Sequence, residues 1–318
     1  MVSDTVSSEV MRFDILTIFP GFFTGIFEHG IVRRALAEGL VTVEMHDLRA
    51  FTHDRHRTVD DRPFGGGEGM VLKPEPLAEA LAGLGIAPRA ERSSRSTTLA
   101  PDQDNGGSFD SLRSAPAAQD DRFVEEPGFA GGTRVILLSA QGRPFTQTVA
   151  RELAKLERVV LICGRYEGVD ERINELYCDM ELSIGDYVLS GGELAAAVVV
   201  DAAMRLVPGV LGNQASGEFE SFGVADAEID SDVEGVPRSQ HGAGGLLDYP
   251  HYTRPAEFGG LRAPEVLMNG DHQQIRRWRR EQQLRKTLAN RPDLLERAAL
   301  SAEDRKLLGA IRRENAGD

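Results

Sequence analysis

The chain has 318 residues and a formal net charge of −14, and 41% of its residues are hydrophobic. This composition is typical of a folded globular protein and excludes a fibrous or an intrinsically disordered chain. No apolar run approaches the roughly 20 residues of a membrane-spanning helix, and the start of the chain lacks the basic and apolar regions of a secretory signal. The two cysteines, Cys163 and Cys178, are too few for a disulfide framework or for paired Cys-x-x-Cys metal motifs. We therefore expect a reduced, cytoplasmic protein of about two domains that does not enter a membrane.

The charge is distributed unevenly along the chain. Residues 245–318 contain 14 basic and 11 acidic residues, a net charge of +3, whereas residues 1–244 carry −17. The most basic stretch is 275–286, IRRWRREQQLRK, with a net charge of +5. Because salt limits electrostatic attraction to roughly 8–10 Å in the cell, the local patch decides which partner is attracted. The acidic total therefore does not exclude nucleic acid.

Strand-like and helix-like patterns alternate through the first two thirds of the chain. Apolar runs of strand length occupy 12–19, 40–45, 134–139, 158–163 and 180–184. Helical spacing occupies 22–39, 75–84, 146–156, 170–176 and 191–207. This alternation predicts an α/β fold, with a mostly parallel sheet and helices on both of its faces.

The C-terminal part follows a different pattern. After residue 245 we expect no strand, and amphipathic helices at 271–288, 292–298 and 301–313 predict a small all-α domain. Two polar stretches, 87–132 and 223–244, have few large apolar residues and are predicted to be mobile. We therefore expect a flexible extension at 1–10, an α/β domain at 11–212, a linker at 213–244 and a helical domain at 245–318.

Glycine-bearing loops follow consecutive predicted strands at 140–142, 164–168 and 184–193. Ligands of open parallel sheets lie beyond the carboxyl ends of the strands, and glycine lets the backbone approach a ligand closely. The three loops together predict a ligand pocket built largely from backbone.

The segment at 46–70 contains two motifs that suggest other chemistry. The run GGGEG at 65–69 is followed by Met70 rather than by Lys-Ser/Thr, so it is not a phosphate-binding P-loop. His53, Asp54 and His56 do not match the spacing of a tetrahedral metal site. We expect an arginine-lined loop that positions a polar substrate.

Seven motifs in register carry a family resemblance: FTHDRHRTVDDRPFGGGEGM, LSAQGRPF, CGRYEGVDER, SIGDYVLSGGE, RLVPGVLGN, GLLDYPHYTRP and NGDHQQIRRWRR. In this order they resemble the bacterial tRNA (guanine-N1)-methyltransferases, the TrmD family of the SPOUT superfamily. The resemblance covers Met11 to about Ile311, apart from the two polar stretches. It implies a knotted SPOUT-type sheet, S-adenosylmethionine as methyl donor, magnesium, tRNA as partner rather than DNA, and a homodimer whose sites use both subunits. The expected product is N1-methylguanosine at tRNA position 37, beside the anticodon.

The resemblance also implies roles for individual residues. Arg165 and Glu167 match positions that place donor and substrate, Arg205 matches an arginine near the target guanine, and Asp248 matches a second acid near the site. The donor is expected to lie against Leu137, Leu138, Ser139, Gln141, Gly142, Gly164, Arg165, Tyr166, Glu167, Gly168, Ser183, Ile184, Gly185, Tyr187, Val188, Leu189, Gly191 and Gly192.

One departure concerns the general base. The family places an aspartate before a Ser-Phe pair, and here Glu220 precedes Ser221-Phe222. Guanine N1 carries a proton at neutral pH, so a base must remove it as the methyl group arrives, and positive charge near O6 must stabilise the product-like charge. We assign the base to Glu220 or Asp248, and the positive charge to Arg205 or magnesium.

Other assignments remain open from the sequence alone. Tyr166 and Tyr187 are candidates for holding a flipped guanine, with core packing as the alternative. Trp278 could stack on a base or pack within its own helical domain. Competing functions are a knotted RNA methyltransferase with another target base, and a non-catalytic RNA-binding or S-adenosylmethionine-sensing SPOUT protein that has lost its base.

Overall fold

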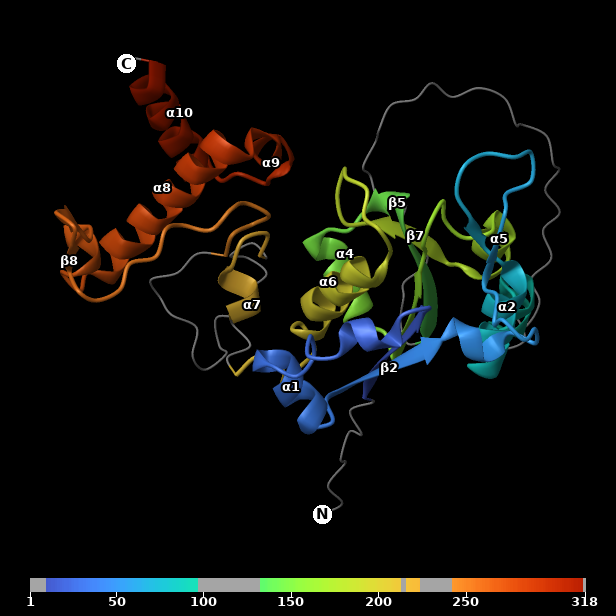
Figure 1. Ribbon diagram of the computed structural model, residues 1–318. Helices are drawn as coiled ribbons and strands as arrows, with labels where there is room; N and C mark the ends of the chain where they lie inside the picture. Colours follow the sequence, from blue (N-terminus) through green and yellow to red (C-terminus); the bar gives the residue numbers. More distant parts are fainter. Residues whose placement is uncertain (1–9, 97–131, 213–215, 224–241, 317–318) are drawn as a thin grey trace, which may run out of the picture. The chain divides into compact units, whose positions relative to one another are not determined.

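The computed structural model describes residues 10–96, 132–212, 216–223 and 242–316 (Figure 1). The chain divides into two compact units, Met1–Val210 and Leu211–Asp318. In the part that the structure describes, no helix has both the length and the apolar character needed to cross a membrane.

Among the described residues of the first unit, five strands form the main sheet in the order β2-β1-β6-β5-β7. Every neighbouring pair in this sheet is parallel, which confirms the predicted architecture. The strands are β1 (Met11–Thr17), β2 (Val41–Asp47), β5 (Thr133–Pro144), β6 (Arg158–Cys163) and β7 (Met180–Ser183). A sheet with both faces covered has near-continuous apolar strands, and β6 is correspondingly buried from Val159 to Cys163.

Helices cover both faces of this sheet (Figure 1). One core joins the sheet to α1 (Gly30–Ala37), α4 (Gln147–Leu153) and α6 (Glu193–Met204). The opposite core joins it to α2 (Pro74–Gly83) and α5 (Glu171–Tyr177). The prediction of helices on both faces is confirmed, and the trefoil knot stays a prediction.

Two predicted elements in this unit have different lengths in the structure. The helix expected at 22–39 is a short 3-10 turn, η1 (Pro20–Phe23), followed by turns and α1. Gly25 and Gly30 adopt φ values of 86° and 61°, a left-handed conformation that ends a right-handed helix. The strand expected at 134–139 continues to Pro144, with a register shift against β7 between Leu138 and Arg143.

The stretch predicted to be mobile at 87–132 begins with an ordered helix. Helix α3 spans Arg89–Ser96, and the Arg92 guanidinium pairs with Asp179 at 3.0 Å. Arg92 also donates to the carbonyl oxygen of Tyr177 at 2.6 Å, where the end of α5 offers unpaired acceptors. The contacts of Arg92 join this helix to Asp179 and to the end of α5, and the polar composition of 87–132 gives no sign of such contacts. The prediction for 97–131 lies outside the described residues.

The second unit contains the predicted helices, α8 (His272–Asn290), α9 (Pro292–Arg297) and α10 (Ala302–Ala316). Leu246, Leu284, Leu295, Leu308 and Ile311 form its apolar core. Part of the predicted linker at 213–244 is ordered as α7 (Ser216–Phe219) and the turn that follows it. The rest of that prediction lies at 213–215 and 224–241, outside the described residues.

The expectation of no strand after residue 245 is wrong. Strands β8 (Glu257–Phe258) and β9 (Leu261–Arg262) form an antiparallel hairpin. Gly259 and Gly260 connect them with φ values of 61° and 80°, as a two-residue hairpin turn requires. Two-residue strands are too short to produce a visible alternation of apolar and polar residues.

Candidate active site

The ends of β5, β6 and β7 enclose a pocket of about 400 Å³ in the first unit, within the roughly 300–1,000 Å³ that is usual for small-molecule sites. Every residue that we expected to contact the donor lines this pocket except Gly142. The residues that also line it, which were not in the predicted set, are Ala140, Val169, Glu171, Glu181, Leu182, Ser190 and Ala195. The three loops therefore converge as predicted.

Gly142 is not among the residues that line this pocket, and its backbone lies against β7. A Cβ atom there would lie 2.5 Å from the backbone nitrogen of Leu182 and 2.6 Å from the carbonyl carbon of Glu181. Gly142 is thus required where β5 crosses close to β7, outside the pocket lining.

Gly192 is where two walls of the pocket approach each other. Its N–H donates to the carbonyl of Gly164 at 2.8 Å, and a Cβ at Gly192 would lie 2.7 Å from the Cα of Cys163. A Cβ at Gly164 would meet nothing closer than 3.4 Å. The backbone therefore excludes a side chain at Gly192 and tolerates a methyl group at Gly164.

The glycine-rich run near residue 69 supports the pocket from outside. A Cβ at Gly69 would lie 2.5 Å from the Oε1 atom of Glu167. The N–H of Glu167 donates to the carbonyl of Met70 at 3.0 Å, and the N–H of Leu72 donates to the carbonyl of Gly168 at 3.0 Å. Met70 and Leu72, which follow this run, thus brace the 164–168 loop, and the glycines at 65–67 and 69 take positive φ values that favour glycine.

Two tyrosines extend from the pocket wall into solvent. Tyr166, with a φ of 59°, and Tyr187 are both more than half exposed. The hydroxyl of Tyr187 donates to the carbonyl of Ile184 at 3.2 Å. Their exposure argues against the alternative that they pack in the core.

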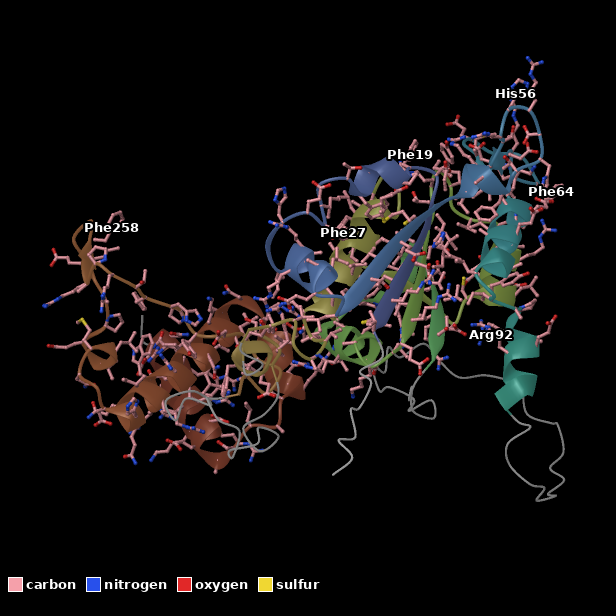
Figure 2. The ribbon with its side chains drawn as sticks, turned by 90° about the horizontal axis from the view of Figure 1, so that it is seen from below. Phe19, Phe27, His56, Phe64, Arg92 and Phe258 are labelled. Atoms are coloured by element: carbon pink, nitrogen blue, oxygen red, sulfur yellow. The ribbon has the colours of Figure 1, made fainter. Side chains whose placement is uncertain are left out.

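The loop at 52–70 projects polar and aromatic side chains outward. Figure 2 shows His56 and Phe64 on this loop, and Phe64 is 98% exposed. His53 pairs with Glu79 at 2.8 Å, and Asp54 accepts from the backbone of its own loop at His56 and Thr58. His53 and Asp54 are thus used in local contacts.

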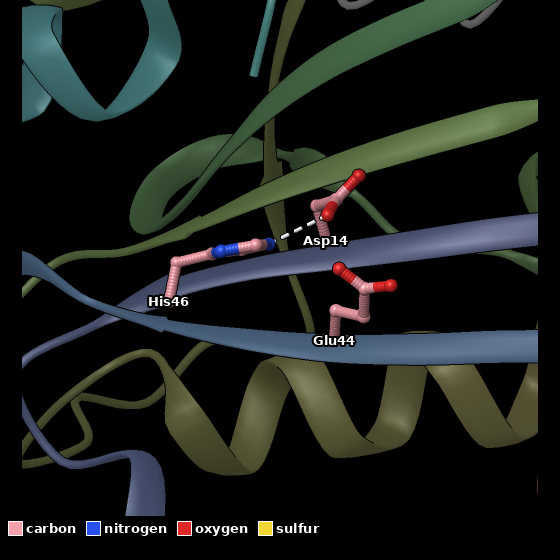
Figure 3. A group of neighbouring side chains, drawn as sticks. All are labelled: Asp14, Glu44 and His46. Atoms are coloured by element: carbon pink, nitrogen blue, oxygen red, sulfur yellow. Dashed lines mark hydrogen bonds and ion pairs between the residues drawn. The ribbon is translucent and has the colours of Figure 1, made fainter. Parts of the chain in front are cut away.

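One group of metal-ligand types does lie together among the described residues. Asp14, Glu44 and His46 present ligand atoms within 4.8 Å of one another, and Figure 3 shows them on β1 and β2 with the Asp14–His46 contact. Two guanidinium groups already occupy this cluster: Arg12 donates to Asp14 at 2.9 Å and to Glu44 at 2.9 Å, and Arg158 donates to Asp14 at 2.6 Å. This cluster is an ion network around the buried Asp14, in which a metal would meet two positive charges.

The three residues expected to act on the substrate lie in two units. Arg205 follows α6 as its C-cap in the first unit. Glu220 and Asp248 belong to the second unit, on adjoining segments: the N–H of Asp248 donates to the Oγ of Ser221 at 2.9 Å, and the N–H of Phe222 donates to the carbonyl of Leu246 at 2.8 Å. The structure thus places the two candidate bases on neighbouring backbone segments.

The carboxylate of Asp248 is already engaged on both sides. One oxygen accepts from the N–H of Tyr249 at 2.8 Å, and the other lies 3.0 Å from Nε2 of His251. Glu220 follows α7, and its carbonyl accepts from the N–H of Gly223 at 2.9 Å, which closes a tight turn.

The basic stretch on α8 divides into structural and surface residues. Arg280 forms a mostly buried pair with Asp304 at 2.7 Å, and Arg285 pairs with Glu281 and Glu314. The guanidinium of Arg279 lies 4.8 Å above the ring of Tyr249. Arg277 is exposed. The stretch is therefore less available to phosphates than its net charge suggested.

Aromatic and apolar side chains accompany these arginines. The rings of Trp278 and Tyr252 lie 6.3 Å apart, so Trp278 contacts a partly exposed neighbour. Phe258 and Leu261 face each other across the hairpin and are both 80% exposed; Figure 2 shows Phe258 at the hairpin.

Fold and pocket together define a class: an α/β protein with a pocket of small-molecule size at the carboxyl edge of a parallel sheet, linked to a helical unit with basic and aromatic surface groups. The model of one family, tRNA (Guanine-1)-methyltransferase TrmD, matches residues 11–99 and 102–297, and the chain belongs to this family.

Named relatives agree along nearly the whole chain. The tRNA (guanine-N(1)-)-methyltransferase of Koribacter versatilis (strain Ellin345) is 52% identical over 302 residues, covering 95% of this chain and 98% of the relative. The protein of the same name from Geobacter metallireducens is 44% identical over 298 residues, covering 94% and 96%. That from Chloroflexus aggregans is 46% identical over 289 residues, covering 91% and 89%. The family inferred from the motifs is confirmed.

Proposed function

We propose that this protein transfers a methyl group from S-adenosylmethionine to N1 of the guanosine at position 37 of tRNA. The observation that carries the proposal is the convergence of the three glycine loops on one pocket in a member of this family. The donor occupies the pocket, and tRNA binds through the second unit. We expect the protein to act in the cytoplasm, where tRNA is modified.

In the proposed reaction, the methyl group leaves the sulfonium and forms a bond to guanine N1, while the N1 proton passes to a carboxylate. S-adenosylhomocysteine leaves as a neutral thioether. Arg205 stabilises negative charge at O6. Tyr166 and Tyr187, both exposed beside the donor pocket, are suited to hold a base that has left the anticodon-loop stack.

We assign the general base to Glu220 rather than to Asp248. Glu220 stands directly before Ser221-Phe222, where the family resemblance places its acid, while Tyr249 and His251 hold the Asp248 carboxylate in a fixed orientation. Asp248 is better suited to position the guanine. Glu220 lies beside it on the segment linked by Ser221.

Magnesium is part of the proposal. The pocket is lined by Glu167, Glu171 and Glu181, and magnesium is commonly held by one or two carboxylates together with oxygens of the substrate and water. Among the described residues these three do not form a three-ligand cluster, so ligand oxygens would complete the coordination. When bound, the ion would supply positive charge next to the reacting groups.

The homodimer is likewise a proposal, and an exposed apolar surface supports it. Leu194 and Val198 lie four residues apart on α6, on one face of the helix, and both are nearly half exposed. Phe22 and Ile26 are also exposed, and η1, which contains Phe22, packs against α6. We expect a second copy to cover this surface, and Val198→Asp to shift the sedimentation of the protein from dimer to monomer.

The decisive experiment is methyl transfer from labelled S-adenosylmethionine to an unmodified tRNA transcript. We expect N1-methylguanosine, identified by mass, with a guanosine at position 37 and no product when that position is adenosine. Transfer to a different base would favour another RNA methyltransferase. Donor binding without transfer to any tRNA would favour the non-catalytic sensing protein. The one feature that favours that alternative is the glutamate at position 220, where the family resemblance implies an aspartate.

A further inference from the structure

A buried carboxylate lies behind the wall of the pocket. Glu193 begins α6, directly after the 184–192 loop, and only 1% of it is exposed. A buried charge is costly unless it is paired and hydrogen-bonded. The partners of Glu193 therefore show what the residue is for.

Glu193 binds Arg165 and Thr17. The Nε atom of Arg165 lies 3.2 Å and 3.1 Å from the two carboxylate oxygens, and its Nη2 atom lies 3.0 Å from Oε2. The hydroxyl of Thr17 donates to Oε1 at 2.8 Å. Thr17 lies 176 positions away in the sequence, at the end of β1.

The same contacts fix the side chain of Arg165 from a second side. Its guanidinium lies 4.5 Å above the ring of Phe19, and the N–H of Phe19 donates to the hydroxyl oxygen of Thr17 at 3.0 Å. Arg165 itself lines the pocket. Thr17, Phe19 and Glu193 thus clamp one pocket residue from β1 and α6.

We infer that Glu193 is a positioning residue that pre-organises the donor pocket by fixing Arg165 between its carboxylate and the ring of Phe19. The inference rests on the proposed function in one respect only, that the pocket ligand is S-adenosylmethionine. Arg165 and Gly191 also form an isolated antiparallel bridge, so the clamp holds the 164–168 loop against the 184–193 loop. Glu193 acts through Arg165 and does not touch the reacting atoms.

The guanidinium is held in a way that leaves one edge for a ligand. Glu193 engages Nε and Nη2, and among the described residues no hydrogen bond to Nη1 is found. A guanidinium has five N–H donors in a fixed plane, so a carboxylate that fixes one edge also sets the direction of the remaining donors. Loss of the clamp would leave the ring of Phe19 as the remaining contact described for the guanidinium, and its direction toward the pocket would no longer be fixed.

A purely structural role predicts a different outcome. Replacing both members of a buried ion pair is often neutral for stability, whereas removing one member leaves an unpaired charge. A structural pair would therefore affect unfolding without a specific effect on donor binding. The clamp predicts an effect on donor binding that depends on Arg165.

The test compares Glu193→Gln, Arg165→Gln and the double variant by calorimetric titration with S-adenosylmethionine and by thermal unfolding. We expect each single variant to weaken donor binding about tenfold, and the double variant to be no weaker than Arg165→Gln. We expect the KM for the donor to rise in Glu193→Gln, while kcat at saturating donor stays within a few-fold. The unfolding temperature should fall most in Arg165→Gln, which leaves Glu193 unpaired, and should recover in the double variant.

Thr17 provides a matched control. Thr17→Ser keeps the hydroxyl and should bind the donor like the parent, whereas Thr17→Val keeps the shape, loses the hydrogen bond and should weaken binding several-fold. Unchanged donor affinity in Glu193→Gln, or losses in the two single variants that multiply in the double variant, would overturn the inference. If the parent protein itself binds no S-adenosylmethionine, the proposed function fails, and that result is recognised before any variant is measured.

Discussion

Replacing Gly192 by alanine should disrupt both the fold and the donor pocket. The added Cβ would lie 2.7 Å from the Cα of Cys163, whereas ordinary contact begins at 3.4 Å. Two backbone segments would have to separate by the difference, about 0.7 Å, and neither is a flexible side chain. The hydrogen bond from Gly192 to the carbonyl of Gly164, now 2.8 Å, would lengthen as they move apart.

The size of the effect follows from these two losses. Overpacking in a well-packed interior costs about 1–3 kcal/mol, and a lost backbone hydrogen bond adds about 1 kcal/mol. A total of about 2–4 kcal/mol corresponds to a fall of roughly 5–15 °C in the unfolding temperature for a domain of this size. Donor affinity should fall at least tenfold, because residues 163–164 and 191–192 belong to facing pocket walls.

Gly164→Ala is the matched control. Its Cβ would meet its nearest atoms at 3.4 Å and 3.7 Å, so the unfolding temperature should stay within about 2 °C of the parent. A loss of donor affinity in Gly164→Ala without loss of stability would indicate that the donor itself needs the space at Gly164. An unfolding temperature for Gly192→Ala equal to that of Gly164→Ala would refute the close approach on which this reasoning depends.

Three further predictions concern other parts of the molecule. Glu220→Gln should lower the single-turnover methylation rate by about 10²-fold or more, as expected for loss of a general base, while Glu220→Asp retains substantial activity; a dead Asp248→Asn beside an active Glu220→Gln would instead assign the base to Asp248. Arg277→Gln should weaken tRNA binding and reduce its salt dependence by about one counterion without changing the unfolding temperature. Arg280→Gln should instead lower the unfolding temperature of the second unit, because it removes the ion-pair partner of Asp304. If both variants weaken tRNA binding equally and neither changes stability, the division of the basic stretch into structural and surface arginines is contradicted. Burial raises the pKa of Asp14, but the hydrogen bonds from Arg12, Arg158 and His46 lower it by more, so that the net shift is downward. Asp14→Asn should therefore lower the free energy of unfolding by about 2–4 kcal/mol at pH 7. Denaturant titrations should show that this difference between variant and parent shrinks below about pH 4.

Most of the α/β unit could be predicted from the sequence because buried parallel strands are nearly continuous runs of apolar residues. The run RVVLIC was predicted as a strand at 158–163, and β6 has those bounds. The helix at 22–39 was overestimated because its periodicity is real but Gly25 and Gly30 take left-handed conformations that only the folded chain reveals. Hairpin β8–β9 was missed because it is held by its turn glycines rather than by a patterned strand.

In the candidate site, the arrangement of the backbone could be predicted from the sequence, but the contacts between side chains could not. Loops at the ends of consecutive strands could be predicted to converge, since parallel strands share an edge. The contact between Thr17 and Glu193 joins positions 176 residues apart, and no local pattern predicts it. A signal was present all the same: Glu193 and Asp201 are the two charged residues of the mostly apolar helix ELAAAVVVDAAM, and an acidic residue that is buried in such a helix needs a partner.

The surroundings of the two cysteines determine the protonation of their thiols. Burial, with the negative charge of Glu193 as the next cause, raises the pKa of Cys163 well above its ordinary value, and burial raises the pKa of Cys178 to about 12. Both thiols therefore stay protonated at neutral pH, although Cys163 ends the strand that leads into the pocket. A protonated thiol is a poor nucleophile, and neither cysteine is among the residues that we propose to act on the substrate.

The replacement of the family's aspartate by Glu220 can be reconciled with a working base through the geometry of its turn. Phe222 adopts a left-handed φ of 63°, and Gly223 packs so closely that its Cβ position would lie 2.7 Å from the carbonyl oxygen of Glu220. These constraints fix the backbone at residue 220, while Ser221 ties the segment to Asp248. Glu220→Asp keeps a carboxylate on the same backbone segment, so under the proposed assignment we expect it to slow the reaction rather than to abolish it.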